Sequence, residues 1–202
     1  MFAVGHLALG YLLAKAAQKL LKTEVNLPLI FFLSLIPDAD LLIPGLVHRS
    51  ISHSVIIVIL LFIPFFLYYR EKSIPYFIAT AQHALVGDLL TNGGAEIFWP
   101  LTTAWFGLGL DMRGWGNILL EWASFLLAMA VLIRTNDLKL LLKPSRSSLL
   151  LVVPAGAILV SAFIGEGAAP IELLIPHLVL LALFAFAILS YVLSFGHSAR
   201  SE

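Results

Sequence analysis

Long apolar stretches constrain this chain more than any other feature of its sequence. Four of them reach or approach the roughly 20 residues that a helix needs to cross a bilayer. They are Ile51 to Tyr69, Asn117 to Ile133, Leu149 to Ile164 and Ile171 to Phe195. Of the 202 residues, 60% are hydrophobic and only 12% are charged, so water cannot be the main solvent of the folded chain. We therefore predict an integral membrane protein.

Three further stretches are apolar but are interrupted by polar residues. They are Phe2 to Leu21, Val25 to about Ile43, and Pro75 to Leu90. Together, the seven stretches predict an all-α, polytopic transmembrane helix bundle of about seven membrane segments, some of them short or re-entrant. No positive charge precedes the apolar core of the first stretch, so we expect a retained helix rather than a cleaved signal peptide.

The basic residues predict the orientation in the membrane. With seven crossings, the linkers Lys15 to Glu24, Arg70 to Ser73 and Arg134 to Arg146 share one face with the C-terminal tail, and this face holds all Lys and Arg except Arg49 and Arg113. The positive-inside rule then places the N-terminus outside and the C-terminus in the cytoplasm of a plasma or inner membrane. An outer aromatic belt is predicted from Trp99, Trp105, Trp115 and Trp122.

The chain is predicted to form one membrane domain, residues 1–202. The polar stretch Thr91 to Gly116 is expected to be an outer loop or a re-entrant segment. Residues 1–116 carry most of the polar chemistry, whereas residues 117–202 are expected to serve mainly as a scaffold. His177 lies in the last predicted helix, away from any acidic partner in the sequence, and is expected to be structural.

Composition argues against nucleic-acid binding and excludes any site built from cysteine. The formal net charge is zero and the pI is about 7.0, so the chain lacks the basic excess that nucleic-acid binding requires. It has no cysteine, which excludes disulfides and thiolate metal sites. Any strong metal ligands must therefore be His, Asp or Glu.

In the predicted topology, seven His and Asp residues lie at or near the outer ends of the first four segments. They are His6, Asp38, Asp40, His48, His53, His83 and Asp88. A carboxylate at membrane depth costs several kcal/mol unless it is paired. A divalent metal would offset that cost, because carboxylates and neutral imidazoles are natural ligands. We predict a metal site here, with Zn²⁺ as the expected ion and Mn²⁺ or Mg²⁺ as alternatives.

Two of the motifs allow more than one interpretation. Pro37-Asp38-Ala39-Asp40 sets two carboxylates in a turn, where they can reach one ion, bridge two, or simply end a helix in solvent. In His48-Arg49-Ser50-Ile51-Ser52-His53-Ser54, two imidazoles flank an arginine where a helix begins, with Ser50 or Ser52 as a possible N-cap. This second motif predicts two metal ligands and an Arg49 that grips phosphate, or else a polar interfacial collar.

His83 and Asp88 pose a geometric question. A spacing of five residues places them about 140° apart on an ideal helix. They can share one metal only if Gly87 allows a local bulge or the helix unwinds. Otherwise they serve different ions or roles, or form a hydrogen-bonded pair that joins two helices.

Taken in order, several motifs resemble the YdjM-type family of membrane-bound, metal-dependent hydrolases. They are Gly5-His6-Leu7, Leu35 to Asp40, His48 to Ser54, His83 to Thr91, and Phe98-Trp99-Pro100. That family has been linked to the zinc-dependent phospholipase C superfamily, whose metal clusters hydrolyse phosphoester bonds. The resemblance extends to about Pro100 and implies a metal site built from the seven His and Asp residues. Ser50 and Ser52 replace the family's usual glycine and threonine, and the last His and Asp are five rather than four residues apart.

The function expected from these features is a metal-dependent hydrolase. Metal-activated water would cleave a phosphoester held near Arg49, with Asp88 or Glu121 as general base. The substrate is expected to be a lipid or lipid-linked phosphoester at the outer face, with membrane lipids as the surrounding partners. The alternatives are an ion or small-solute transporter and a protein whose polar cluster only fixes helix packing. Clustering at one face argues against a transport pathway across the membrane.

Overall fold

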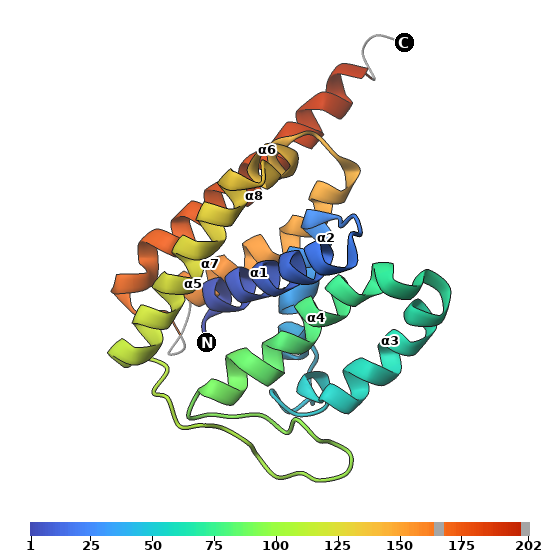
Figure 1. Ribbon diagram of the computed structural model, residues 1–202. Coiled ribbons are helices and arrows are strands. Elements are labelled where there is room, and N and C mark those ends of the chain that lie inside the picture. Colours follow the sequence, from blue (N-terminus) through green and yellow to red (C-terminus); the bar gives the residue numbers. More distant parts are fainter. Residues whose placement is uncertain (164–167, 199–202) are drawn as a thin grey trace.

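The computed structural model describes residues 1–163 and 168–198, and every named element in these ranges is helical (Figure 1). The α-helices are α1 (Ala3–Leu21), α2 (Leu27–Leu35), α3 (Val55–Tyr69), α4 (Ile74–Gln82), α5 (Trp115–Arg134), α6 (Asp137–Leu142), α7 (Val152–Phe163) and α8 (Leu174–Ser198). The short 3₁₀ helices are η1 (Ile36–Leu42), η2 (Ile51–His53), η3 (Arg70–Ser73), η5 (Arg146–Leu151) and η6 (Ile171–Leu173), and η4 (His83–Asp88) is a π-helix. The predicted all-α class is confirmed.

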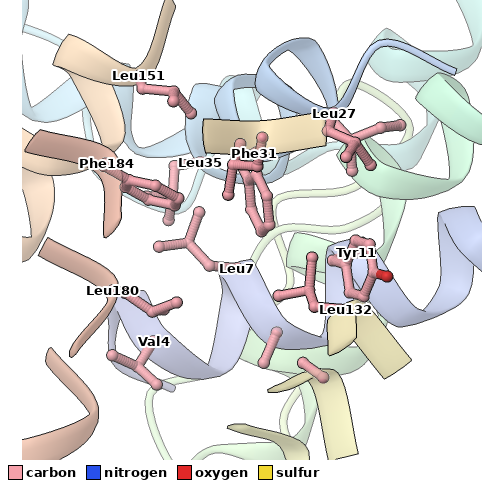
Figure 2. Close-up of a cluster of buried hydrophobic side chains, with 14 of the residues drawn as sticks. Val4, Leu7, Tyr11, Leu27, Phe31, Leu35, Leu132, Leu151, Leu180 and Phe184 are labelled. Carbon is pink, nitrogen blue, oxygen red and sulfur yellow. The ribbon is translucent and has the colours of Figure 1, made fainter. Parts of the chain in front are cut away.

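Helix α1 lies at the centre of the molecule and packs against α2, α4 and α5. Its buried Leu7 and Tyr11 join the main hydrophobic core, together with Phe31 of α2 and Phe184 of α8 (Figure 2). Gly10 allows α1 to approach α2 closely, because a Cβ at this position would lie 2.0 Å from Ser34 Oγ. The packing fixes α1 and α2 relative to each other, and both carry residues of the site described below.

Three helical stretches are long and apolar enough to cross a membrane. They are Trp115–Arg134, Arg146–Phe163 and Ile171–Phe195. They coincide with three of the four long stretches in the sequence, although residue 164 of one of these lies outside the described residues. The predicted membrane protein of several helices is thus confirmed. The count of seven crossings and the orientation of the termini stay predictions.

Apart from α1, the helices of the first half are shorter than the apolar stretches suggest. Helix α3 has 15 residues, or about 22 Å, because the chain before it turns through η2. Ser54 is its N-cap and accepts a hydrogen bond from the backbone N–H of Ile57 at 3.4 Å. The expectation of Ser50 or Ser52 as the N-cap is therefore wrong, since both hydroxyls bind carboxylates instead.

The loop between η4 and α5 folds back over the segment that precedes α3. Two isolated β-bridges, Thr91 to Leu110 and Ala95 to Phe106, close it on itself. Its backbone then binds the neighbouring segment: Glu96 N–H donates to the Arg49 carbonyl and Val55 N–H donates to the Ile97 carbonyl, both at 2.9 Å. The loop therefore holds the backbone of residues 49–55 in place.

Candidate metal centre

All seven predicted metal ligands come together in space, from five segments of the first half. His6 comes from α1, Asp38 and Asp40 from η1, His48 from the following loop, His53 from η2, and His83 and Asp88 from η4. Within the described residues they form three overlapping groups that could hold a metal ion: His6 with His83 and Asp88, Asp38 with His53 and His83, and Asp40 with His48 and His53. The convergence that the sequence predicts is confirmed.

The π-helix η4 resolves the question of the five-residue spacing. In a π-helix the backbone hydrogen bonds run from residue i to residue i+5, so residues five apart lie near the same face. His83 Nε2 accordingly lies 3.7 Å from Asp88 Oδ2. The local bulge that the sequence required for these two residues to share an ion is present, and it includes Gly87.

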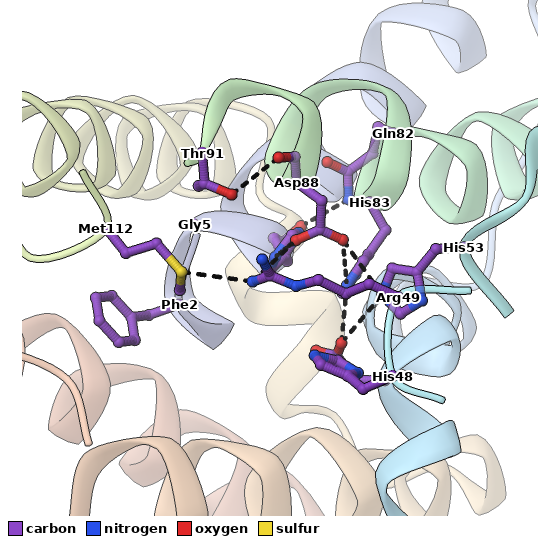
Figure 3. A network of polar contacts seen from close by, with 12 residues as sticks. Phe2, Gly5, His48, Arg49, His53, Gln82, His83, Asp88, Thr91 and Met112 are labelled. Atoms are coloured by element: carbon purple, nitrogen blue, oxygen red, sulfur yellow. Dashed lines mark hydrogen bonds and ion pairs between the residues drawn. The ribbon is translucent and has the colours of Figure 1, made fainter. Parts of the chain in front are cut away.

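Asp38, His53, His83 and Asp88 form the centre of the cluster, called here the central quartet; His53, His83 and Asp88 are labelled in Figure 3. Asp38 Oδ1 lies 3.1 Å from His83 Nε2 and 3.4 Å from His53 Nε2. Asp88 Oδ2 lies 3.2 Å from His53 Nε2 and 3.7 Å from His83 Nε2. A tetrahedral zinc ion with bonds of about 2.0–2.1 Å separates its ligand atoms by about 3.3–3.4 Å. These four contacts, from 3.1 to 3.7 Å, are close to that separation.

Two buried atoms of the quartet, His53 Nε2 and Asp88 Oδ2, lie 3.2 Å apart as an ion pair, and neither makes a hydrogen bond within the described residues. An unsatisfied buried polar group costs about 1–3 kcal/mol, and more when it is charged. A metal ion between these atoms would satisfy both, so the residues present fit a divalent ion.

The outer nitrogens of the two quartet histidines are held by neighbouring groups. His83 Nδ1–H donates to the Ser34 carbonyl at 2.7 Å, which leaves the Nε2 lone pair directed into the quartet. His53 Nδ1 lies 2.9 Å from Ser52 Oγ and 3.4 Å from Asp40 Oδ2, and the Ser52 hydroxyl donates to Asp40. Such contacts behind metal-binding histidines fix the tautomer and the ring orientation.

His6 contacts the quartet from the side of α1. Its ring stacks on His83 with a centroid distance of 3.6 Å, and its Nε2 lies 3.7 Å from Asp88 Oδ1. This contact depends on Gly87, where a Cβ would lie 2.2 Å from the His6 ring. His6 is therefore placed to complete the site or to buttress His83.

His48 lies at the solvent side of the cluster. Its Nδ1 is 2.9 Å from Asp40 Oδ1, and its side chain is 37% exposed, whereas those of His53 and His83 are fully buried. The Asp38 side chain is 28% exposed. The cluster therefore reaches the surface at Asp38 and His48 and is buried at the other quartet residues.

Arg49 is held in a strained conformation with its guanidinium beside the quartet. Its φ of 64° lies in the left-handed region, which is uncommon for a residue with a side chain. The Nη2 atom lies 3.5 Å from Asp88 Oδ1 and donates to Met112 Sδ at 3.4 Å (Figure 3). Gly93 leaves room for the group, since a Cβ there would lie 2.1 Å from Arg49 Nη1. Arg49 thus places one fixed cation at the edge of the site.

Glu121 is in none of the three groups of described residues that could hold a metal. It is fully buried on α5, where its carboxylate accepts hydrogen bonds from the backbone N–H of Phe2 at 2.7 Å and of Gly5 at 3.2 Å. The Asn117 side chain donates to the same carboxylate at 2.9 Å. These contacts make Glu121 a carboxylate cap for the N-terminus of α1, a favourable place for negative charge.

Asp40 and His53, which lie outside the three long helices, have perturbed pKa values. Burial by itself raises the pKa of Asp40, but hydrogen bonds, above all from His53, hold it below its ordinary value. Burial by itself lowers the pKa of His53, but its contacts with the carboxylates of Asp38 and Asp40 raise it to about 9. The positive charge of protonated His53 therefore offsets part of the negative charge of the nearby carboxylates. A bound divalent ion would take over this role.

Two residues of the site were not predicted as members from the sequence. Ser52 connects Asp40 with His53, and Glu96 is a buried carboxylate that accepts a hydrogen bond from Ser50 Oγ at 2.6 Å. Glu96 is the only acidic residue between Asp88 and Asp111, which is the one sequence signal that singles it out.

The fold and the site together define a helical membrane protein with buried His and Asp groups that could hold a metal ion. Its sequence matches the family described as YdjM inner membrane protein over residues 1–169, and the chain belongs to this family. The match confirms the resemblance seen in the motifs, extends it well beyond Pro100, and confirms the inner membrane as the location. No curated protein and no solved structure matches the chain.

Proposed function

We propose that the protein is a metal-dependent hydrolase that cleaves a phosphoester of a lipid or lipid-linked molecule at the membrane surface. The observation that carries this proposal is the central quartet. Three of its residues, Asp38, His53 and His83, form one of the groups that could hold a metal ion, which would leave the fourth position of a tetrahedral ion for water beside Asp88. A bound divalent ion, with Zn²⁺ as the first choice, supplies water activation near neutral pH and polarises the phosphoryl group.

The chain's own residues would bind the phosphate and accept the proton. Arg49 offers a guanidinium fork whose Nη2 already faces the quartet, a geometry suited to phosphate oxygens. When Arg49 turns to the phosphoryl group, Asp88 Oδ1 loses this contact and is free to accept a proton from the attacking water. Asp88 therefore becomes the candidate general base, because Glu121 already binds the N–H groups of α1.

The placement of the site favours a substrate with a membrane-embedded part. Asp38 and His48 mark the surface side of the cluster, close to the beginning of the apolar helix α3. The exposed side chains of α3 include Leu61 and Phe65, which are expected to face hydrocarbon. An amphiphile can therefore present its phosphate to Arg49 without leaving the bilayer.

The test is phosphoester hydrolysis by purified protein in phospholipid vesicles, after loading with Zn²⁺ or Mn²⁺. We expect phosphate release from lipid phosphates, and a loss of at least about 100-fold in the His53→Gln variant. His177→Gln is the matched control, because His177 is also fully buried but bonds to Leu173 and Ser161 in the second half. Equal activity in the parent and in His53→Gln would contradict the proposal.

A further inference from the structure

An apolar groove of about 710 Å³ lies between α2, α3 and α4. Its walls include Leu33 from α2, Val58 and Phe62 from α3, and Tyr76 from α4. The volume is in the range of about 300–1,000 Å³ that is typical of small-molecule sites. Most of its lining is hydrocarbon or aromatic, so the groove does not suit a polar solute.

Three residues that line the groove lie close along the chain to ligands of the central quartet. Each of its three walls continues along the chain into a segment that supplies a quartet ligand. Ile36 lines the groove two residues before Asp38, and Thr80 lines it three residues before His83. On the third wall, Val58 follows His53 by five residues. Ile36, Thr80 and Val58 therefore mark the end of the groove that is two to five residues along the chain from three quartet ligands.

Charged residues line the groove only at its other end, where Glu24 and Lys72 lie. Between Val58 and Tyr69, both lining residues of α3, the helix rises about 16 Å. A molecule that fits this shape has a polar group at the quartet and a long apolar chain along α3. That is the shape of a lipid phosphate.

We propose that this groove holds a hydrocarbon chain of the substrate while the phosphate lies at Arg49 and the quartet. The inference rests on the proposed hydrolase function, to which it adds a substrate class: phosphoesters that carry a long acyl or prenyl chain. A chain that enters the groove from the bilayer leaves hydrocarbon rather than water, so its binding depends on how closely it packs against the groove walls. Selectivity is thus expected to follow the fit of the chain to the groove as well as the headgroup.

The test uses a photoreactive probe that the enzyme cannot cleave: a phosphonate analogue of phosphatidic acid with a diazirine at the end of one acyl chain. The full-length protein is reconstituted in phosphatidylcholine vesicles with the probe, illuminated, and digested for mass spectrometry. We expect crosslinks on groove residues of α3 and α4, and their competition by excess unlabelled phosphatidic acid. Crosslinks spread evenly over α3 and α8, without competition, would overturn the inference and indicate surrounding bilayer lipid only.

A matched pair of variants separates the groove from the general lipid-facing surface. Leu61 and Leu60 are neighbouring leucines of α3, 63% and 55% exposed, but of the two only Leu61 lines the groove. Leu61→Trp is expected to fill the groove and reduce the competable crosslinks at least fivefold, whereas Leu60→Trp leaves them unchanged. An equal effect of both substitutions, or none from Leu61→Trp, would contradict the inference.

Hydrolysis and metal content measured on the same samples distinguish this inference from the proposed function. If the parent hydrolyses lipid phosphates but crosslinks elsewhere, the groove assignment fails and the hydrolase proposal stands. If the crosslinks map to the groove but no phosphoester is cleaved, the chain-binding groove stands and the hydrolase proposal fails.

Discussion

Individual residues of the site are fixed by close contacts that tolerate little change. Gly87 lies so close to His6 that a Cβ would overlap the ring, at 2.2 Å from Cε1. His6 in turn stacks on His83. A side chain added at Gly87 is therefore expected to displace the His6 ring and, through it, the ring of His83.

Gly87→Ala is expected to destabilise the protein by about 1–3 kcal/mol, because it overpacks a closed site. Replacing His6 by Ala in the same chain removes the obstacle, so the double variant should be more stable than the sum of the two single changes predicts. Thermal unfolding of the four proteins in detergent measures this coupling. A Gly87→Ala protein with parental stability would show that the His6 contact is not formed.

Asp40 acts behind His53 rather than in the quartet, so its substitution is expected to weaken metal binding without abolishing it. Asp40→Asn should lower the affinity about 10–100-fold, the usual effect of losing a contact behind a metal ligand. Asp38→Asn should lower it further, because Asp38 lies in the quartet itself. Competition with a chromogenic chelator measures both. A larger loss of metal affinity in Asp40→Asn than in Asp38→Asn would contradict this assignment and indicate that Asp40 is the ligand.

At the scale of elements, the π-helix η4 is the feature that makes the site possible. The spacing of His83 and Asp88 indicates that a bulge is needed, and the structure contains it. The elements that hold the site together are not visible in the sequence. Ser50 pairs with Glu96, which is 46 residues away, and so the helix start moves to Ser54. Local sequence patterns predict where helices lie and which residues can bind a metal, but they do not predict such long-range pairings.

Removing the bulge residue provides a test of this element. Deletion of Leu85, which is partly exposed, leaves His83 and Asp88 four residues apart, so an ordinary α-helix would again align them. We expect the deletion variant to retain metal binding. Insertion of one alanine after Leu85 should instead abolish it, since six residues fit neither helix type. If the deletion abolished binding and the insertion did not, this account of η4 would be wrong.

At the scale of the molecule, the two halves of the chain carry different features. The site lies in the first half, and the long apolar helices α5 and α8 lie in the second. Hydrophobic stretches of membrane length predict these long helices well, because the bilayer sets their length. The same reasoning fails for the first half, where Pro37 lies in η1 just after α2 and Ser54 starts α3 late.

The predicted orientation can be tested directly because the chain contains no cysteine. Single cysteines at Gly109 or Arg113 should react with a membrane-impermeant maleimide added to intact spheroplasts. Cysteines at Lys72 or Lys139 should react only after the membrane is opened. The reverse pattern would place the N-terminus in the cytoplasm and move the cluster to the inner face.

The central claim is that the quartet holds a divalent ion, and metal content tests it most directly. Elemental mass spectrometry of the detergent-purified parent should find about one divalent ion per chain, with Zn²⁺ expected. The ion should be lost in Asp38→Asn, His53→Gln and His83→Gln, and retained in His177→Gln. A folded parent that binds no divalent ion under any loading condition, or quartet variants that keep it, would contradict the account.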